Sequence, residues 1–467
     1  MKDEFDLIVI GAGSGGLTAV KFAVRLGLRV ALVEKHKIGG DCTWTGCVPS
    51  KALLHVAKQA QAVNSAALYG IQTQTAQVDM KQVKAYIDKV VADIYQHETP
   101  EEIGRQGVEV VLGTARFLDA RRIAVGERIL TGKKFILATG AHPFIPSIAG
   151  LAEVPFVTYE QIFANEVLPE HLLILGAGPT GMEMGQAYVR LGAQVTVVDE
   201  VVLPDDEPEV GQVMTHILAG EGVQFVDGLA TAVSYTNNQF TLHVQGDTAQ
   251  TLASDMLLVA TGRRPNVAEL DLEKAGVVYS EDGIVVNKQL ATAQSHIYAV
   301  GDCIGGQQFT HLAGWQAFTA VRNAFMPGNS KGKPAVMGWT TFTDPEVAHI
   351  GLTEEEAWQR YGASAWAVTQ SLDRVDRAVT DNARTGFIKI VRHRNGRVLG
   401  ATIVAPRAGE MISELSVAMQ NDIPLRGIAD TIHPYPSYSV GVQLVAADEA
   451  AEDFFEGIVG KIVRKLI

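Results

Sequence analysis

The sequence predicts an α/β protein in which two similar β–α–β units precede a C-terminal α+β domain. A glycine-rich turn follows a short apolar run at Gly11 and again, 165 residues later, at Gly176. Each turn opens a helix-compatible segment that leads to a second apolar run ending in an acidic residue. Beyond a turn-rich linker at 326–334, strand-like segments recur at 386–391 and 399–404, as is typical of an α+β domain.

The first unit has the pattern of a Rossmann-like dinucleotide-binding motif. A strand-like run at 5–10 precedes Gly11, Gly13 and Gly16, and a second run, from residue 29, ends at Glu34. The glycines allow the backbone to approach a pyrophosphate at the helix N-terminus, and Glu34 is placed to accept from a ribose hydroxyl. The alternative is that such a turn serves packing alone.

The second unit repeats this pattern with Gly176, Gly178 and Gly181, and its second strand ends at Asp199. A carboxylate there favours the 2′-hydroxyl of NAD, whereas a 2′-phosphate requires a nearby basic residue. Between residues 195 and 274 the only basic residues are Arg263 and Arg264. We therefore expect NADH rather than NADPH, with Asp199 as a merely solvated strand end as the alternative.

Composition excludes several classes of function. The 467 residues are enough for about three domains. The 39 Lys and Arg against 52 Asp and Glu give a net charge of −13, which disfavours nucleic acids and anionic membranes as partners. No apolar run approaches the roughly 20 residues of a membrane span, and the N-terminus has no secretory pattern. We expect a cytoplasmic protein.

Two of the three cysteines, Cys42 and Cys47, form a close pair. Pro49 suits the first turn of a helix, so Cys47 would lie near the positive end of a helix dipole, which stabilises a thiolate. A zinc site lacks two further ligands at suitable spacing, and no metal site is predicted. A redox pair in a reducing compartment is expected, and two independent buried thiols are the alternative.

These motifs resemble a known family over nearly the whole chain. The two glycine-rich units and residues 39–51, 260–266 and 298–302 resemble the flavoprotein pyridine nucleotide–disulfide oxidoreductases. The resemblance implies a homodimer that uses FAD and a nicotinamide dinucleotide. Residues 39–42 and 309–311 are most similar to mercuric-reductase-like members and residues 51–58 to dihydrolipoamide dehydrogenases, so the subfamily stays open.

The resemblance and the recurring strands predict that the chain leaves its first domain and later returns to it. Apolar runs that stop at Gly140 and Gly262 each close one dinucleotide-binding domain. The predicted parts are an FAD-binding domain at 1–148, an NAD-binding domain at 149–268, a return segment at 269–335 that completes the FAD domain, and an interface domain at 336–467.

The resemblance also implies which residues contact the cofactors. On the FAD side these are Gly11, Gly13, Gly16, Glu34, Lys51, Ala115, Gly140 and Asp302. On the NAD side they are Gly176, Gly178, Gly181, Glu183, Asp199 and Gly262. Lys51 and Glu183 are expected to pair beside the flavin, where a cation stabilises the reduced form. The alternative is an ordinary surface pair.

The implied reaction passes electrons from NADH through the flavin to Cys42–Cys47 and on to a thiol-reactive substrate, either a disulfide such as lipoamide or Hg(II). Cys42 is expected to be the exposed, attacking thiol, and Cys47 the thiolate nearer the flavin. Alternatives are a quinone reductase or NADH oxidase, in which the flavin reduces the acceptor directly, and a redox-sensing flavoprotein.

The C-terminal region departs from the family's His-Pro-Thr-x-x-Glu motif, whose histidine acts as general acid and base. One register places Tyr435 at the base position, and His433, two residues away, is the other candidate. Aligning the motif's base position with either Tyr435 or His433 leaves its last position without a glutamate. His433 is a base or a satisfied interface histidine. Cys303 is a third soft ligand or a small buried residue.

The last residues, 454–467, form an amphipathic pattern with apolar residues at every fourth position from Phe454 to Leu466. Packing against the dimer is the default expectation, and contact with a membrane surface is the alternative.

Overall fold

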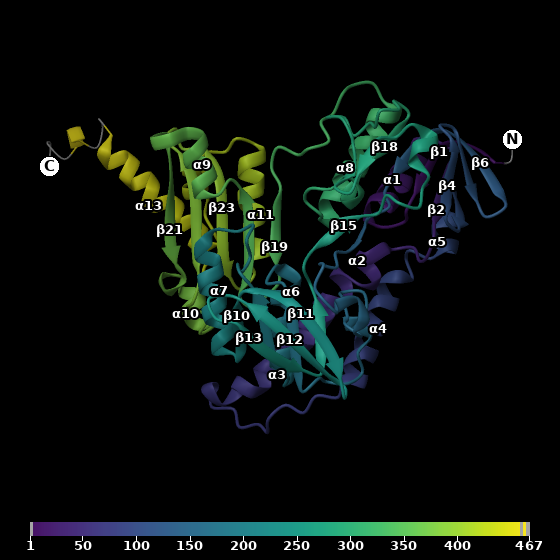
Figure 1. Cartoon of the computed structure of the whole chain (residues 1–467). Helices are drawn as coiled ribbons and strands as arrows, with labels where there is room; N and C mark the ends of the chain where they lie inside the picture. Colours follow the sequence, from purple (N-terminus) through teal and green to yellow (C-terminus); the bar gives the residue numbers. More distant parts are fainter. Residues whose placement is uncertain (1–2, 458–460, 464–467) are drawn as a thin grey trace.

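A computed structural model describes residues 3–457 and 461–463 of the chain. An N-terminal and a C-terminal lobe flank a central unit that lies below and between them in the view of Figure 1. None of the described helices is long and apolar enough to cross a membrane.

The N-terminal lobe is built on a mixed sheet in the order β3-β2-β1-β6-β5-β4. Its central strands are parallel and buried, because apolar runs such as Leu7–Ile10 are covered on both faces. Their bounds are Glu4–Ile10 (β1), Val30–Glu34 (β2), Val108–Leu112 (β3), Ala115–Asp119 (β4), Arg122–Val125 (β5) and Arg128–Leu137 (β6). Helices α1 (Ser14–Arg25), α2 (Gly40–Trp44), α3 (Cys47–Ser65), α4 (Met80–Tyr95) and α5 (Pro100–Arg105) belong to the same part of the chain.

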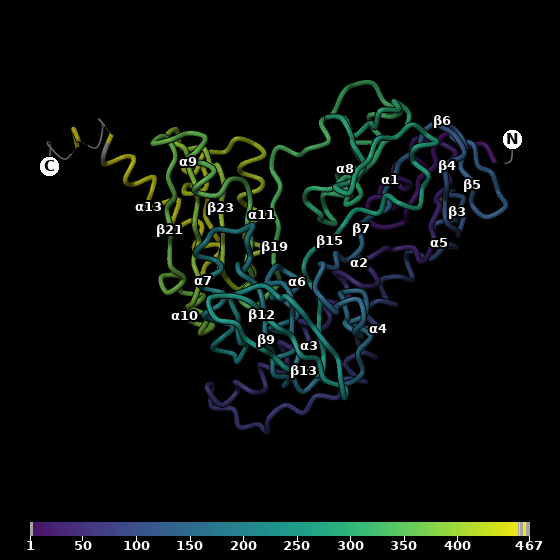
Figure 2. The backbone as a smooth tube through the Cα atoms, in the orientation of Figure 1, coloured from purple at the N-terminus to yellow at the C-terminus, as the bar shows by residue number. Residues whose placement is uncertain are grey.

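The chain returns to this lobe after completing the central unit. Strand β18 (Ile297–Ala299) pairs in parallel with β6, with Ile297 opposite Phe135. Helix α8 (Thr310–Phe325) packs against α1, and Figure 2 follows the tube back to this side. The short strands β7 (Ala141–Pro143) and β15 (Arg263–Pro265) pair where the chain leaves and re-enters, while β16 (Tyr279–Ser280) and β17 (Gly283–Ile284) form a small hairpin. The exact domain boundaries stay a prediction.

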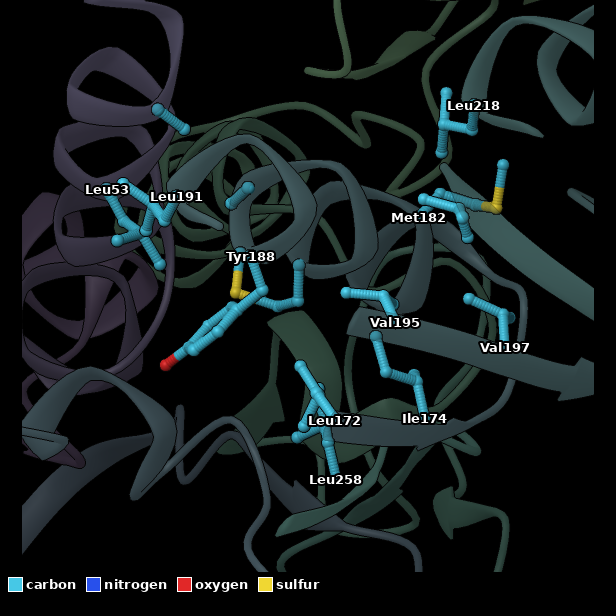
Figure 3. Packing of buried hydrophobic residues seen from close by; sticks show 14 of the residues in the cluster. Leu53, Leu172, Ile174, Met182, Tyr188, Leu191, Val195, Val197, Leu218 and Leu258 are labelled. Atoms are coloured by element: carbon cyan, nitrogen blue, oxygen red, sulfur yellow. The ribbon is translucent and has the colours of Figure 1, made fainter. Parts of the chain in front are cut away.

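The central unit has a parallel sheet in the order β10-β9-β8-β14. Its strands are β8 (His171–Leu175), β9 (Gln194–Asp199), β10 (Val223–Asp227) and β14 (Met256–Val259); its helices are α6 (Pro179–Leu191) and α7 (Pro208–Gly220). An antiparallel sheet of β11 (Leu229–Thr236), β12 (Gln239–Gln245) and β13 (Gln250–Ser254) adjoins it. Figure 3 shows Tyr188 and Leu191 of α6 packed among strand residues and Leu53 of α3. This packing fixes α3, which begins with Cys47, against the second unit.

The C-terminal lobe is an antiparallel sheet in the order β19-β20-β23-β22-β21, covered by helices. The strands are β19 (Gly338–Thr341), β20 (Glu346–Gly351), β21 (Ala365–Ser371), β22 (Phe387–His393) and β23 (Val398–Ala405). The helices are α9 (Glu354–Tyr361), α10 (Asp376–Thr380), α11 (Ala408–Gln420), α12 (Leu425–Ala429) and α13 (Val440–Glu456). The expected strands at 386–391 and 399–404 therefore exist as β22 and β23.

A buried lysine fastens the C-terminal lobe to the central unit. Lys389 of β22 is 3% exposed and lies 3.1 Å from Glu207 and 3.0 Å from Glu209, at the start of α7. Glu354 of α9 approaches the same ammonium to 2.6 Å. The surrounding carboxylates offset the cost of burying the charge.

Half of the expected amphipathic helix at 454–467 lies outside the described residues, which include neither Ile458 nor Leu466. Helix α13 ends at Glu456, and the Phe454 and Ile462 side chains are about half exposed.

Candidate functional site

The first glycine turn brings the N-terminus of α1 to the carboxyl end of β1. Gly11 has a φ of +98°, and a Cβ there would lie 2.3 Å from the carbonyl oxygen of Ala138. A Cβ at Gly16 would lie 1.8 Å from the carbonyl oxygen of Gly11, so both positions require glycine. A Cβ at Gly13 would meet only Gly40 Cα, at 3.8 Å. The backbone next to the helix N-terminus is therefore open to an anion.

Glu34 ends β2 beside this turn. Its Oε2 accepts the backbone N–H of Ala12 at 2.8 Å, and its Oε1 accepts that of His36 at 2.7 Å. Each carboxylate oxygen keeps a further lone pair for a ribose hydroxyl.

The second unit repeats these contacts with a constant offset of 165 residues. Gly176 has a φ of +106°, and a Cβ at Gly181 would lie 1.9 Å from the Gly176 carbonyl oxygen. Asp199 Oδ2 accepts the N–H of Ala177 at 2.7 Å, as Glu34 does from Ala12. A Cβ at Gly178 would enter open space. Both turns thus have the geometry of a dinucleotide-binding site.

Two more glycines border the same open edges. Gly140 follows β6 with a φ of +71°, Gly262 follows β14 with a φ of +116°, and a Cβ at either would enter open space. Ala115 is the buried first residue of β4. Open backbone at Gly13 and Gly140 fits FAD on the first unit. Open backbone at Gly178 and Gly262 fits a nicotinamide dinucleotide on the second.

Arg263 links Asp302, expected on the FAD side, to the helix that carries Cys42. Its Nη1 lies 2.8 Å from Asp302, and its Nη2 forms an ion pair with Asp41, which directly precedes Cys42. Its Nε donates to the Tyr159 hydroxyl at 3.2 Å. Burial raises the pKa of Asp302, and the positive charge of Arg263 only partly offsets this rise. The Arg263 guanidinium is thus already committed to two carboxylates.

Cys42 and Cys47 lie on separate helices. Cys42 is in α2, Cys47 begins α3, and Thr45 and Gly46 form the connection. A Cβ at Gly46 would lie 2.9 Å from the Asp41 carbonyl oxygen, so this tight connection requires glycine. The break between the helices lets the two thiols, which are free, lie close enough to change each other's pKa. Cys47 Sγ also lies 3.4 Å from the Thr310 hydroxyl at the start of α8.

The two thiols differ in acidity. The hydrogen bond from Cys42 lowers the pKa of Cys47 to about 6, assisted by Thr310 and the charge of Lys51, and opposed by burial and by Glu183. The same hydrogen bond, together with burial, raises the pKa of Cys42. Cys47 is therefore the thiolate at neutral pH and Cys42 the protonated donor.

The two thiols differ in exposure in the single chain, and which of them attacks the substrate stays a prediction. Cys47 is exposed, whereas Cys42 is half-buried. Cys42 lies within the short helix α2, whereas Cys47 starts α3 and contacts Thr310.

Lys51, one turn after Cys47, forms the expected pair with Glu183. Its Nζ lies 3.0 and 2.9 Å from the two carboxylate oxygens, and Glu183 is 5% exposed. Helices α3 and α6, which are distant in sequence, bring the two side chains together next to the thiols. The burial of Glu183 distinguishes this pair from an ordinary exposed surface pair.

The C-terminal candidates have carboxylate partners that no sequence motif indicates. His433 Nε2 lies 2.7 Å from Glu414 Oε1 of α11, and its Nδ1 lies 3.0 Å from the Thr431 carbonyl oxygen. The imidazole is only 6% exposed. Tyr435 is 71% exposed and donates its hydroxyl to Asp376 at 2.6 Å, a hydrogen bond that raises the pKa of the phenol.

Cys303 lies apart from the redox pair. It is fully buried, and its thiol donates to the carbonyl oxygens of Val300 and Leu137. Burial raises its pKa to about 11, so it is a small buried residue rather than a thiolate ligand. Across residues 3–457 and 461–463, no cluster of three His, Cys, Asp or Glu side chains is arranged to hold a metal ion.

Sequence reasoning missed Thr310, Asp41 and Glu414 as contacts of the site. Thr310 carries a weak signal, because it opens the helix that follows Gly301-Asp302. Asp41 carries another, because it lies next to Cys42. Glu414 carries none.

Two dinucleotide units that meet at a thiol pair define an oxidoreductase that couples a flavin, a nicotinamide and a disulfide. Residues 5–317 match the family model of pyridine nucleotide-disulphide oxidoreductases, and residues 337–446 match the model of that family's dimerisation domain. The chain belongs to this family. It is therefore an FAD-dependent NAD(P)H oxidoreductase of the disulfide type, and its dimerisation domain supports a homodimer.

Several named relatives cover almost the whole chain. Mercuric reductase of Lysinibacillus sphaericus is 32% identical over 95% of this chain and 82% of the relative. Dihydrolipoyl dehydrogenase of Thermus scotoductus is 34% identical over 96% of this chain and 97% of the relative. The HOCl-induced flavoprotein disulfide reductase RclA of Escherichia coli has a similar structure, with a TM-score of 0.84, 27% identity and coverage of 95% and 99% of the two chains.

Proposed function

We propose that this protein oxidises NADH and passes the electrons through FAD and the Cys42–Cys47 pair to a thiophilic metal ion. The observation that carries the proposal is the placement of Cys42 and Cys47 on adjoining helices, with the Lys51–Glu183 pair one turn after Cys47. The neighbouring Cys42 and the charge of Lys51 lower the pKa of Cys47. A thiolate is both the nucleophile of disulfide chemistry and a ligand of soft metals.

Each protein group has a defined part in this route. Bound FAD supplies two-electron transfer between a hydride donor and the thiols. Glu34 and the open backbone at Gly13 and Gly140 hold it, and the ammonium of Lys51, fixed by Glu183, supports negative charge beside it. Cys42 stays half-buried as the proton donor to Cys47 when the pair is reduced.

NADH is the proposed donor because no Lys or Arg follows Asp199 in the sequence until Arg263 and Arg264. Arg263 is paired with Asp41 and Asp302, and Arg264 lies 2.8 Å from Glu281. Asp199 itself is placed to accept from a 2′-hydroxyl and would repel a phosphate.

A metal ion is the proposed acceptor because disulfide exchange needs a group that protonates the leaving thiolate. Both ring nitrogens of His433 lie within hydrogen-bond distance of acceptors, and its imidazole is buried, so we infer that it is a structural histidine. The hydrogen bond to Asp376 raises the pKa of Tyr435, which makes its phenol a weaker proton donor. Two sulfur ligands suit Hg(II) or copper. The balance is NADH plus Hg(II) giving NAD⁺, a proton and Hg(0), or NADH plus two Cu(II) giving NAD⁺, a proton and two Cu(I).

The printed names of some relatives support this choice of acceptor, whereas the dihydrolipoyl dehydrogenase relative acts on a different substrate class by its name. Several are named mercuric reductases, and one solved structure of RclA is described as a Cu(II) complex.

A second candidate, direct reduction of a quinone by the flavin, is favoured by aromatic surface on α8. Trp315 and Phe318 are 40% and 44% exposed, and the Phe318 ring lies 4.4 Å from that of Phe22. Such a surface suits a planar apolar acceptor.

The test is NADH oxidation with Hg(II), Cu(II), lipoamide, glutathione disulfide and a soluble quinone as separate acceptors. We expect the metal ions to give the highest turnover, Cys47→Ser to abolish it and Cys303→Ser to retain it. Faster turnover with either disulfide would contradict the metal proposal. Quinone turnover that exceeds the metal rate and survives Cys47→Ser would replace it with the second candidate.

A further inference from the structure

Phe342 connects the C-terminal lobe to the Lys51–Glu183 pair. It directly follows β19, inside the part of the chain that matches the dimerisation domain. Its backbone N–H donates to Glu183 Oε1 at 2.9 Å, and Lys51 Nζ lies 4.4 Å from the centre of its ring. A cation within about 6 Å of a ring face is attracted to it. One residue of the C-terminal lobe therefore contacts both members of the pair.

The backbone around Phe342 is held by one face of α6. Glu183, Gln186 and Arg190 follow one another at helical spacing and point to the same segment. Gln186 exchanges two hydrogen bonds of 2.7 Å with the backbone N–H and carbonyl oxygen of Asp344. Arg190 Nη1 donates to the Asp344 carboxylate at 3.0 Å. These contacts fix the chain on both sides of Thr343, and with it the ring of Phe342.

The position of the Lys51 ammonium matters for Cys47. Lys51 follows Cys47 by one turn of α3, so the two side chains lie on the same side of the helix. The positive charge of Lys51 there favours the Cys47 thiolate, whereas the charge of Glu183 opposes it. The lysine side chain is 37% exposed, so solvent leaves it room to move away. A group that confines the ammonium therefore affects how much thiolate is present.

We propose that Phe342 is a positioning residue that confines the Lys51 ammonium between its ring and Glu183, and so keeps Cys47 reactive at neutral pH. The role rests on the proposed function in one respect, that Cys47 is the redox thiol. The C-terminal lobe then contributes to the redox site of its own subunit as well as to the dimer.

The test compares Phe342→Leu with Phe342→Tyr in the dimeric, FAD-loaded enzyme after reduction with dithiothreitol. Leucine keeps the backbone N–H to Glu183 and removes the ring, whereas tyrosine keeps the ring face. The rate of Cys47 alkylation by iodoacetamide is followed from pH 5 to 9 by peptide mass spectrometry. Loss of a ring–cation contact of typical strength predicts an alkylation rate about two- to fivefold lower at pH 6 for the leucine variant. The tyrosine variant is expected to match the wild type.

Tyr361→Leu is the matched control, because it removes a ring near Arg360 in the same lobe. We expect it to leave the alkylation profile unchanged. An unchanged profile in Phe342→Leu, or an equal decrease in all three variants, would overturn the proposal. Wild-type Cys47 that NADH fails to reduce would contradict the proposed function instead, so the two failures are distinguishable. Flavin absorbance and dimer size identify a leucine variant that has lost its fold, and Phe342→Met then repeats the comparison.

Discussion

The imidazole of His433 lies 2.7 Å from the carboxylate of Glu414, a residue of helix α11 that belongs to no recognised motif. His433 lies in the region where the family has a histidine and a glutamate within one short motif, whereas Glu414 comes from a different part of the chain. Its burial and the second contact of His433 to Thr431 indicate that it holds the C-terminal segment in place.

Glu414→Ala is expected to lower the free energy of unfolding by about 1–3 kcal/mol, because it leaves a buried ring nitrogen without a partner. Turnover per folded enzyme should stay within about twofold of the wild type. Chemical denaturation and steady-state kinetics measure the two effects. Glu410→Ala, an exposed position one turn earlier on α11, is the control. A loss of turnover beyond tenfold with little change in stability would make His433 the acid–base group after all.

Asp199→Ala is expected to raise the KM for NADH about tenfold or more, because a charged acceptor of a ribose hydroxyl contributes roughly 1.5–3 kcal/mol. The KM for NADPH should change less, so that the preference for NADH narrows. Initial-rate kinetics with both nucleotides measure the ratio, and Glu200→Ala provides an exposed neighbouring carboxylate as control. Equal changes in KM for NADH and NADPH would indicate that Asp199 only stabilises the turn, by accepting the Ala177 N–H.

Asp206→Asn is expected to stabilise the protein more at high pH than at low pH. Burial raises the pKa of Asp206 to about 7 from an ordinary value of 3.8, and its Oδ1 accepts from Trp339 Nε1 at 3.1 Å. Between these values the folded state binds the extra proton, so this carboxyl makes folding less favourable as pH rises from about 4 to 7.

The gain from Asp206→Asn should therefore be small at pH 4 and reach an upper bound of about 4 kcal/mol at pH 8. The amide oxygen can still accept from Trp339. Urea denaturation at several pH values tests this, with Asp205→Asn, an exposed neighbour, as control. A gain independent of pH would show that Asp206 is ionised throughout the range.

Much of the fold could be predicted because the signals are local. A Cβ at Gly16 would clash with the carbonyl oxygen of Gly11, so the steric requirement at Gly16 is complete within one turn. The acidic ends of the second strands, Glu34 and Asp199, follow from the same short pattern. The return of the chain to its first sheet was expected from recurring strands and is seen in the pairing of β18 with β6.

The contacts around the redox site were less predictable because their partners are distant in sequence. Arg263 reaches Asp41 across 222 residues, and Phe342 reaches Glu183 across 159. The packing of the two lobes and the central unit against one another determines these contacts, and no local spacing in the sequence indicates them. The contact of Cys47 with Thr310 likewise joins residues that lie 263 positions apart in the sequence.

The central claim is that NADH delivers electrons to the Cys42–Cys47 pair with Cys47 as the thiolate beside the flavin. Anaerobic titration with NADH, followed by absorbance, tests it most directly. A long-wavelength band from a thiolate next to the flavin should appear at pH 8, weaken as pH falls through about 6, persist in Cys42→Ser and vanish in Cys47→Ser. Complete bleaching of the flavin at pH 8 without such a band in the wild type would contradict the account.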